Sequence, residues 1–292
     1  MTIRVTVPCS TSNLGAGFDC IGLALNRHLR VTFEPGGQLT IDRLGTLAPL
    51  EGDDIVAEIL RARSLTGSLI LDSNIPVGRG LGSSAAATVA GLAIAAAAAN
   101  EELDYDVALQ KATALEGHPD NAAPALLGGL VAVVSDGASQ RALPMHLCEA
   151  IGFVFAAPHA IISTKAARRA LPEHVPHPVA SRSIARSVAL IEGLAEGDPD
   201  LLRIGFEDEL HVPYRIGMIP GGSEAIEAAR KAGAWAATIS GSGSGLIAVC
   251  ARGAEDAVLA AMASVFAEAT AERAIAFVAA PEFAGVQIER LA

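Results

Sequence analysis

The first half of the chain alternates apolar and polar residues at the spacing of β-strands. This pattern predicts strands at residues 3–7, 30–34, 38–43, 68–73 and 130–135. Apolar residues at helical spacing predict a helix over residues 55–64, and an alanine-rich helix is expected to end near Asn100. A helix over residues 104–117 and a shorter one that stops at Gly128 complete this half.

The second half repeats the mixture of helices and strands. Strands are predicted at residues 151–157, 236–239 and 246–250, and helices at residues 164–170, 183–196, 201–211, 223–232 and from residue 255 onward. Because strands and helices do not alternate strictly, the sequence favours two α+β lobes over a doubly wound sheet. A turn-rich stretch at residues 135–144 is the predicted boundary, which divides the chain into lobes at residues 1–145 and 146–292.

Composition limits the classes of ligand. A chain of 292 residues, of which 51% are hydrophobic, can bury two cores. Its net charge of −11 argues against nucleic-acid binding, because affinity for a phosphate backbone needs clustered Lys and Arg. An anionic ligand would therefore need a local cationic or metal-lined site. The four cysteines form no CxxC pair, which predicts reduced thiols and no zinc site.

The chain shows no feature that predicts export or membrane insertion. The N-terminal residues alternate like a strand and lack a continuous apolar run, so a secretory signal is not expected and a cytoplasmic location is predicted. The alanine-rich run at residues 85–99 is too short and too weakly apolar to cross a bilayer core of about 30 Å, so no membrane partner is expected.

A glycine-rich loop leads into the alanine-rich helix, with the sequence PVGRGLGSSAA at residues 76–86. It lacks the Lys-Ser/Thr ending of a P-loop. The helix start exposes backbone N–H groups at the positive end of the helix dipole, which could wrap the oxygens of an oligophosphate. The alternative is a flexible turn in which Ser83 or Ser84 caps the helix.

Two further clusters combine a flexible backbone with carboxylates. Residues 8–19 have the sequence PCSTSNLGAGFD, in which a Gly-Ala-Gly backbone that can pass close to a ligand comes just before Asp19. Asx and Ser/Thr turns would also explain the polar residues of this stretch. Residues 116–130, EGHPDNAAPALLGGL, crowd Glu116 and Asp120 together, and Mg²⁺ needs only one or two carboxylates beside phosphate oxygens. Capping of the following helix by Asp120 or its neighbour is the alternative.

A fourth cluster, ATISGSGSGLIAV at residues 237–249, reads as a strand, a Gly/Ser loop and a second strand. So many glycines suggest a backbone that must lie against another part of the molecule, whereas a plain flexible hairpin is the simpler explanation.

The stretches STSNLGAGFD, PVGRGLGSSAA, EGHPDNAAPALLGG and ISGSGSG, in this order, resemble the GHMP small-molecule kinases and, among them, the homoserine kinase branch. The resemblance spans essentially the whole chain. It implies an N-terminal lobe of the ribosomal S5 domain 2 type and a ferredoxin-like C-terminal lobe, with the site between them. It also implies ATP-dependent phosphorylation of the side-chain hydroxyl of L-homoserine in threonine biosynthesis. Homodimers are common in this family, so a homodimer is a candidate assembly.

The resemblance implies a nucleotide site on the glycine loop. The implied ATP-binding residues are Pro76, Val77, Gly78, Arg79, Gly80, Leu81, Gly82, Ser83, Ser84, Ala85 and Ala86, together with Gly241, Ser242 and Gly243 of the last glycine loop. Ser84 and Glu116 are the implied ligands of Mg²⁺. Arg79 either adds a cationic contact or is a solvated arginine of the loop.

The resemblance also implies a pocket for a zwitterion. The implied substrate contacts are Thr11, Asn13, Asp19, His118, Thr164, Arg168 and Arg215, and the implied catalytic residues are Asp19, Asp120, Asn121 and Arg168. Arg215 is the expected carboxylate partner, since a guanidinium can bind a carboxylate through two hydrogen bonds. Asp120 occupies the place where some relatives have a base, whereas Asn121 could orient the hydroxyl instead.

Two other functions remain open from the sequence. One is a GHMP kinase with another acceptor, such as a mevalonate-type enzyme, and the other is a catalytically silent nucleotide-binding regulator on the same fold. Asp19 and Arg215 argue against the first, because mevalonate has no ammonium group to bind. Ser84, Glu116 and Asp120 argue against the second, because a binding module could lose its metal ligands freely.

Overall fold

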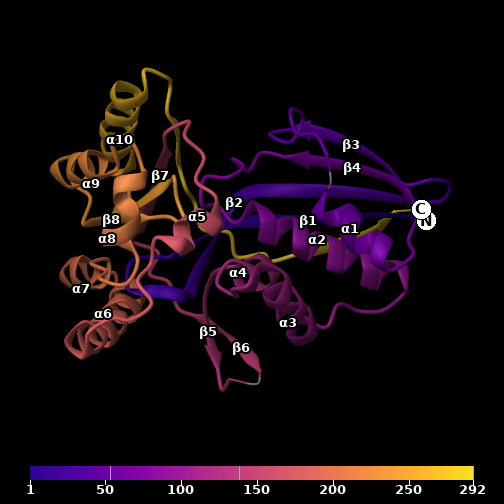
Figure 1. Cartoon of the computed structure of the whole chain (residues 1–292), viewed down its shortest axis with the longest axis horizontal. Coiled ribbons are helices and arrows are strands. Elements are labelled where there is room, and N and C mark those ends of the chain that lie inside the picture. The colour runs from indigo at the N-terminus through magenta and orange to yellow at the C-terminus, as the bar shows by residue number, and fades with distance from the viewer. Residues whose placement is uncertain (53, 138, 292) are drawn as a thin grey trace.

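The chain forms two lobes, each built on its own β-sheet (Figure 1). The computed structural model describes residues 1–52, 54–137 and 139–291. The first sheet has the order β11-β1-β2-β4-β3, and β2 also pairs with β5, which pairs with β6. Its strands are β1 (Thr2–Asn13), β2 (Gly17–Pro35), β3 (Thr40–Gly45), β4 (Gly67–Ser73), β5 (Leu130–Ser135), β6 (Gln140–Met145) and β11 (Gln287–Leu291).

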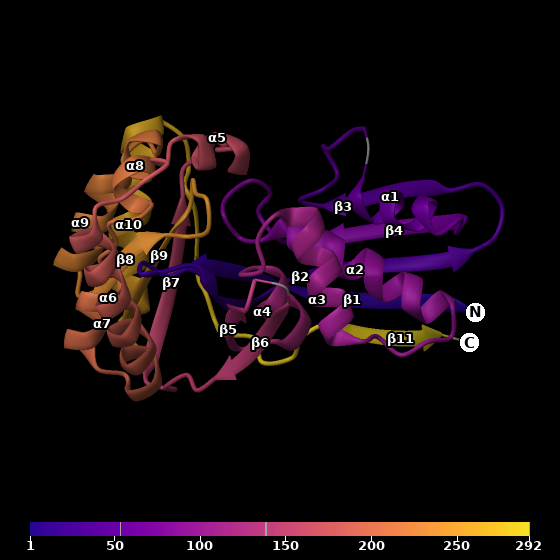
Figure 2. The ribbon, with the colours of Figure 1, turned by 60° about the horizontal axis from the view of Figure 1, so that its bottom comes forward.

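Helices of the first lobe pack against one face of this sheet, as Figures 1 and 2 show. They are α1 (Ile55–Ala62), α2 (Ser83–Ala98), α3 (Tyr105–Glu116) and α4 (Ala122–Leu127). In the outer half of β1, buried Ile3, Val5 and Val7 alternate with Arg4 and Thr6 on the more exposed face, so the period-2 pattern sets which face the helices cover. Alanine makes up most of α2, and its small side chain lets this helix approach β1 closely.

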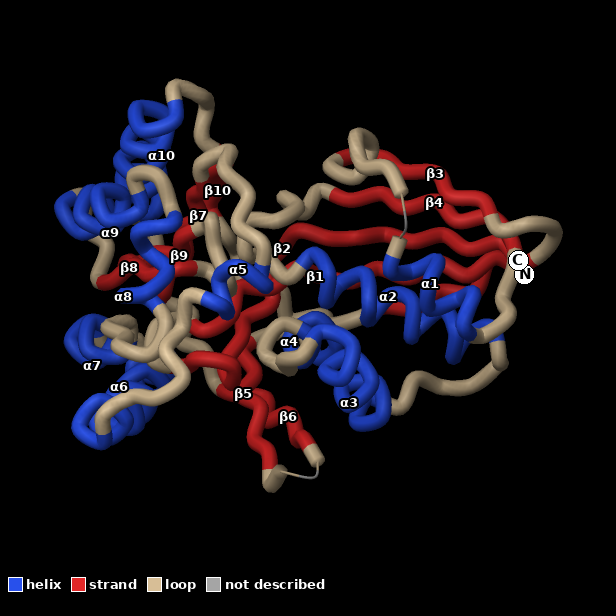
Figure 3. Tube along the Cα trace, in the orientation of Figure 1, coloured by secondary structure: helices blue, strands red, loops and turns tan. Residues whose placement is uncertain are grey.

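The second lobe is a ferredoxin-like unit, as the sequence resemblance implied. Its antiparallel sheet has the order β10-β7-β9-β8 and comprises β7 (Ile151–Ala157), β8 (Ala236–Ile239), β9 (Leu246–Ala251) and β10 (Ile275–Val278). The helices are α5 (Thr164–Arg169), α6 (His177–Glu196), α7 (Pro199–Gly205), α8 (Val212–Arg215), a 3₁₀ turn η1 (Ile216–Met218), α9 (Gly222–Lys231) and α10 (Glu255–Thr270). Every residue of β7 is buried, because elements pack on both of its faces (Figure 3).

Several element boundaries differ from the sequence expectation. Strands β1 (Thr2–Asn13) and β2 (Gly17–Pro35) extend well beyond the predicted strands at residues 3–7 and 30–34, so most of the polar stretch at residues 8–19 is strand. Helix α6 begins at His177 instead of residue 183, because a proline is tolerated in the first turn of a helix. Helix α7 ends at Gly205 instead of residue 211, since the Asp208 carboxylate accepts hydrogen bonds from the N–H groups of the segment that follows. The stretch at residues 135–144, predicted as turns, contains most of β6, whose Pro144 is acceptable because β6 is an edge strand.

The two ends of the chain meet in the first sheet (Figure 2). Strand β11 pairs antiparallel with β1, from Thr2 opposite Leu291 to Thr6 opposite Gln287. The proposed division after residue 145 falls between β6 and β7, which lie in different sheets, but β11 returns from the second half of the chain to the first sheet. Neither β10 nor β11 was expected from the sequence.

The tip between β1 and β2 reaches into the second lobe. The Ala16 N–H donates to the Gly205 carbonyl of α7 at 3.0 Å, and the Ser187 hydroxyl of α6 donates to the Ala16 carbonyl at 2.5 Å. Asn13, Leu14 and Asp19 around this tip have positive φ angles of 72°, 49° and 56°, which non-glycine residues adopt rarely. Contacts with the second lobe therefore hold a strained turn that carries polar side chains.

Removal of residues 287–292 tests the contribution of β11. We expect a lower thermal midpoint, because β1 loses its edge partner, and each kcal/mol of stability lost corresponds to about 2–4 °C in a chain of this size. Thermal unfolding followed by circular dichroism measures the change. Glu289→Ala, which removes only an exposed ion pair with Arg4, is the control and should leave the midpoint nearly unchanged. An unchanged midpoint in the truncated chain would contradict a structural role for β11.

Candidate functional site

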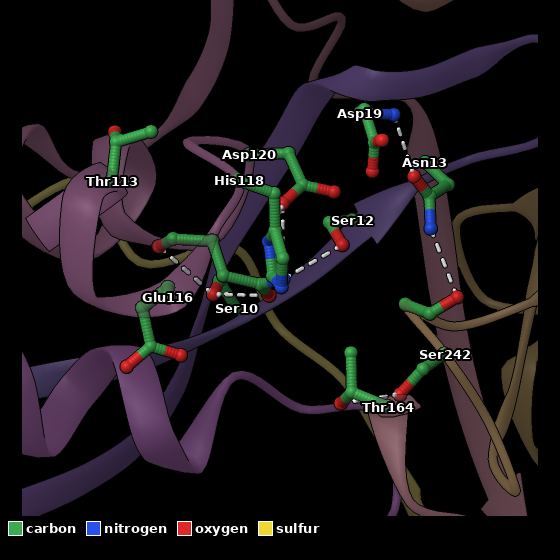
Figure 4. Close-up of polar contacts among 12 residues, drawn as sticks. Ser10, Ser12, Asn13, Asp19, Thr113, Glu116, His118, Asp120, Thr164 and Ser242 are labelled. Carbon is green, nitrogen blue, oxygen red and sulfur yellow. Dashed lines mark hydrogen bonds and ion pairs between the residues drawn. The ribbon is translucent and has the colours of Figure 1, made fainter. Parts of the chain in front are cut away.

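One pocket between the lobes gathers residues from all four polar clusters of the sequence. Its lining residues are Ser12, Asn13, Asp19, Gly78, Gly80, Leu81, Gly82, Ser83, Ser84, Ala85, Glu116, His118, Asp120, Asn121, Thr164, Arg168, Arg215, Gly241 and Ser242. Figure 4 shows Asp19, Asn13, Asp120 and His118 near one another, with Thr164 and Ser242 on another side of the site. The predicted site residues that do not line this pocket are Thr11, Pro76, Val77, Arg79, Ala86 and Gly243.

The glycine loop presents an open helix start to the pocket. Gly82 is the N-cap of α2 in the left-handed conformation, and no side chain caps this helix. A Cβ at Gly82 would lie 2.5 Å from Ser10 Oγ, so only glycine fits. Ser83 and Ser84 are the first residues of the helix rather than its cap, which makes the capping alternative wrong. The N–H groups and the positive dipole end of α2 are therefore available to an anion.

The last glycine loop lies directly against the first. The Ser240 hydroxyl donates to the Gly80 carbonyl at 2.6 Å, and the Gly245 N–H donates to the Arg79 carbonyl at 3.1 Å. Thr11 is fully buried, and its hydroxyl pairs with that of Ser240 at 2.8 Å, so it supports this contact instead of facing the pocket. The backbone of the β8–β9 hairpin therefore packs on the glycine loop, as its glycine content suggested.

Arg79 neither faces the pocket nor lies in solvent. Its guanidinium donates to the carbonyls of Val77, Gly78 and His159, at 3.2, 3.4 and 2.5 Å. The side chain is buried, and burial lowers the pKa of Arg79 from its ordinary value. This arginine therefore holds the loop in shape and ties it to the second lobe.

A serine and a glutamate lie side by side at the start of α2. The Ser84 hydroxyl donates to Glu116 Oε1 at 2.8 Å, and the Thr88 hydroxyl donates to the same oxygen at 2.7 Å. No group of three or more His, Cys, Asp and Glu side chains suited to a metal occurs among the residues that the structure describes. One carboxylate and one hydroxyl nevertheless fit Mg²⁺, a hard cation that takes oxygen ligands and obtains most of them from phosphates and water.

A buried hydrogen-bonded group lies beside the glycine loop. His118 Nδ1 and Asp120 Oδ1 are 2.6 Å apart, and Asp120 is 2% exposed. Asn121 donates from Nδ2 to Ser12 Oγ at 2.9 Å and accepts from Ser10 Oγ at 2.9 Å. Although Asn121 is the N-cap residue of α4, its side chain makes no capping bond, and these contacts tie it to β1 instead.

Across the pocket, charges of opposite sign come from the two lobes. Arg168 of α5 donates two hydrogen bonds to the Asp19 carboxylate, at 2.8 and 3.0 Å, and this hydrogen bonding raises the pKa of Arg168. Arg215 is 2% exposed, and only its Nε has a hydrogen-bond partner among the described residues, the Ala167 carbonyl at 3.1 Å. Burial, followed by the nearby Arg168, lowers the pKa of Arg215. A buried guanidinium that lines a pocket without a carboxylate partner is a ready receptor for an anion.

The sequence analysis did not identify the aromatic residues that pack against the Arg215 guanidinium. The rings of Phe18 and His211 stack with centroids 4.9 Å apart, and the Arg215 guanidinium lies 5.2 Å from the Phe18 centroid. His211 is fully buried, its Nε2 lies 3.3 Å from the Gly15 carbonyl, and burial lowers the pKa of its ring. Phe18 lies inside the quoted motif at residues 8–19, but His211 lies outside all of the quoted motifs, and no spacing rule could indicate that the two rings would stack.

A second, more apolar pocket adjoins the first. Its apolar lining comes from Ile55, Ile59, Ala62 and Leu115, and it shares Ser84, Glu116, His118 and Thr164 with the first pocket. Glu58 and Thr88 complete its lining. The start of α2 and Glu116 therefore stand between an apolar pocket on one side and the charged pocket on the other.

Gly80→Ala tests the contact between the two glycine loops. The new Cβ would lie 1.9 Å from the Ser240 carbonyl, at a residue with φ of +75°, so the loops must separate and affinity for ATP should fall at least tenfold. Gly78→Ala is the matched control, since its φ is also positive but its Cβ meets only the side chain of exposed Ile161. Isothermal titration with ATP compares them, and equal losses would show that backbone strain alone is responsible.

The His118 pair predicts a pH-dependent titration. Burial alone would lower the pKa of His118, but the hydrogen bond and charge of Asp120 outweigh it and the net shift is upward. The protonated pair should therefore stabilise the fold below the unfolded-state pKa of about 6.5, and this contribution is lost as pH rises through the folded pKa. Asp120→Asn should lower the His118 titration midpoint measured by NMR. A midpoint that does not move would contradict the pairing.

Comparison with known proteins identifies the family. Residues 52–129 match the model of the GHMP kinases N terminal domain, and residues 190–268 match that of the GHMP kinases C terminal. The chain is 40% identical over 274 residues to the homoserine kinase of Moorella thermoacetica, covering 90% of this chain and 92% of that protein. It is 39% identical over 269 residues to a homoserine kinase of Thermus thermophilus, covering 89% of this chain and 91% of that protein.

Solved structures agree with this family. The crystal structure of homoserine kinase from Cytophaga hutchinsonii has a TM-score of 0.83 and 26% identity and covers 99% of this chain and 97% of that one. A mevalonate kinase from Leishmania major, solved with R-mevalonate, has a TM-score of 0.69 at 16% identity, covers 96% of both chains and shares the fold alone. Within the described residues, no helix has the length and apolarity that crossing a membrane requires. With both of its family domains present in order, the chain belongs to the GHMP kinases.

Proposed function

We propose that this protein transfers the γ-phosphoryl group of ATP to the side-chain hydroxyl of L-homoserine, giving O-phospho-L-homoserine in threonine biosynthesis. One observation carries the assignment. The pocket that holds the open start of α2 also presents a carboxylate, Asp19, opposite two guanidinium groups, Arg168 and Arg215. This set of charges complements a zwitterionic alcohol beside a triphosphate. The homoserine kinases that resemble the chain over about 90% of its length support the same substrate.

The two adjoining pockets suit the two ends of ATP. In our proposal the phosphates lie on the loop that ends at Gly82, where the uncapped N-terminus of α2 supplies N–H donors and the positive dipole end. The base would lie in the apolar pocket near Ile55 and Ile59, which shares Ser84 and Glu116 with the phosphate site. The backbone N–H donors at the start of α2 would thus take the place of the lysine with which a P-loop contacts phosphate.

Ser84 and Glu116 are the residues that would hold Mg²⁺. When bound, the ion would neutralise charge on the phosphate oxygens that changes during transfer. The chain's own contribution is to keep the Glu116 carboxylate beside the helix start, where two hydroxyl donors fix one of its oxygens.

Homoserine carries both charges that the other half of the pocket complements. Its carboxylate would bind Arg215, whose terminal nitrogens make no hydrogen bond with the described residues. Its ammonium would bind Asp19, which Asn13 orients by accepting the Asp19 N–H at 2.9 Å. In the free protein Arg168 forms an ion pair with the Asp19 carboxylate. The ammonium of homoserine would therefore either share this carboxylate with Arg168 or displace Arg168 from it. An alcohol without a carboxylate would leave the buried Arg215 guanidinium unpaired, which is costly.

The acceptor hydroxyl needs alignment more than strong base catalysis, because phosphoryl transfer proceeds through a loose transition state. Asp120 already accepts from His118 and is nearly inaccessible, which suits an orienting role better than that of a base in contact with substrate. His118, Thr164 and Ser242 line the pocket as hydrogen-bonding groups for substrate or phosphate. Hydrogen bonds with Ser10 and Ser12 fix the orientation of the Asn121 amide. Because an amide does not ionise, Asn121 would position the acceptor hydroxyl rather than act as a base.

Asp19→Asn tests the ammonium site. It keeps the shape of the side chain and removes its charge, so the KM for homoserine should rise about 10- to 100-fold while the KM for ATP changes little. Asp72→Asn, at an exposed position on β4, is the control. ADP release coupled to NADH oxidation measures both constants, and equal effects on the two substrates would contradict the assignment.

An acceptor panel in the same assay separates the other functions. It contains homoserine, the amino alcohol without a carboxylate, the hydroxy acid without an amine, and mevalonate. Turnover of mevalonate but not homoserine would identify a mevalonate-type kinase. No ADP with any acceptor would favour a nucleotide-binding regulator. A cytoplasmic location and a homodimer remain predictions from the sequence.

A further inference from the structure

Thr88 is a buried polar residue that neither the sequence motifs nor the proposed function assigns. It lies on α2, one turn after Ser84, and its accessible surface is zero. Its hydroxyl donates to Glu116 Oε1 at 2.7 Å, and the Ser84 hydroxyl donates to the same oxygen at 2.8 Å. Residues four apart lie on the same face of a helix, so α2 aims two hydroxyls at one carboxylate oxygen.

Glu116 stands at a helix end where a carboxylate is disfavoured. It is the last residue of α3, and Gly117 follows in the left-handed conformation that terminates the helix. A negative charge at a helix C-terminus is repelled by the partial charge of the last carbonyls. The first two turns of α2 compensate, because the positive end of this helix and the hydroxyls of Ser84 and Thr88 face the carboxylate from the neighbouring helix.

The two hydroxyls use only one of the two carboxylate oxygens. Oε1 accepts both hydrogen bonds, whereas Oε2 accepts none from the residues that the structure describes. The side chain is therefore fixed through one oxygen, and the other is left as an anionic ligand. A metal-binding carboxylate commonly needs such hydrogen bonds to hold its orientation.

A second threonine, Thr113, shows the hydrogen bond that a threonine in a helix usually makes. Thr113 on α3, labelled with Glu116 in Figure 4, donates to the Leu109 carbonyl of its own helix at 2.8 Å. That bond, four residues back, is the usual local partner of a helical threonine. Thr88 instead bonds across to α3, and a β-branched side chain in a helix has few rotamers, so this orientation is well defined.

We propose that Thr88 is a positioning residue for the divalent cation, acting through Glu116, so that the site needs the hydroxyls at both residues 84 and 88. This inference rests on the proposed function, since it assigns Ser84 and Glu116 to Mg²⁺. Loss of the Thr88 hydroxyl frees Glu116 to turn into solvent and weakens the cation in the nucleotide complex. Thr88 does not line the phosphate pocket, and although it belongs to the apolar pocket proposed for the base, its accessible surface is zero. Affinity for the nucleotide without metal should therefore change little.

The experiment measures Mn²⁺ binding by electron paramagnetic resonance in the presence of a non-hydrolysable ATP analogue. Thr88→Val removes the hydroxyl and keeps the branched shape, and Mn²⁺ affinity should fall about tenfold. Thr88→Ser restores the hydroxyl and should recover most of the affinity. Thr113→Val removes the hydroxyl of a neighbouring threonine that does not touch Glu116, and should bind Mn²⁺ like the wild type.

Fluorescence titration of the analogue without metal gives the second readout. The proposal is overturned if Thr88→Val binds Mn²⁺ as the wild type does, since the hydroxyl would then be dispensable for the cation. It is also overturned if the variant loses nucleotide affinity without metal, since Thr88 would then act through the apolar pocket proposed for the base. Both results leave the kinase assignment intact. If the wild-type protein itself holds no Mn²⁺ with the analogue, the cation site of the proposed function and the role of Thr88 fail together.

Discussion

The site depends on a backbone contact between two glycine loops from different lobes. The carbonyls of Arg79 and Gly80 accept hydrogen bonds from the 240–245 hairpin loop, and a Cβ on Gly80 would collide with the Ser240 carbonyl. This approach places the open start of α2 opposite the arginines of the second lobe. Without it the uncapped N–H groups of α2 and the two guanidinium groups would belong to separate surfaces.

Local charge, rather than net charge, would let this protein bind an anion. The chain carries a formal charge of −11, yet its central pocket contains Arg168, Arg215 and the positive end of α2. Arg215 is buried without a carboxylate partner, an arrangement that costs stability unless an anion completes it. The strained turn around Asn13 and Asp19 also costs stability. Contacts with α6 and α7 hold this turn in its conformation.

Polar residues behind the pocket keep its charged groups in place. His118 holds the buried Asp120, Ser10 and Ser12 hold Asn121, and Thr88 joins Ser84 at Glu116. The links of Asn121 to β1 and of Thr88 to Glu116 join segments that are distant in sequence, so a single substitution in a supporting residue can alter the position of a site residue on another element. The chemistry of such a kinase is mainly alignment and charge stabilisation, which explains why so much of the site is devoted to orientation.

The sequence by itself determined the local features of the protein. Periodicity located most strands and helices, and the quoted motifs indicated the family and the candidate site residues Asp19 and Glu116, because close backbone approach and anion binding require particular residue types at fixed positions. Arg215 lies outside these motifs and was implied by the resemblance to the family. Only the tertiary structure decided which residues come into contact. Pairing of β11 with β1, the inward turn of Arg79, the burial of Thr11 and the link from Thr88 to Glu116 all depend on contacts between distant segments, and no local pattern encodes those contacts.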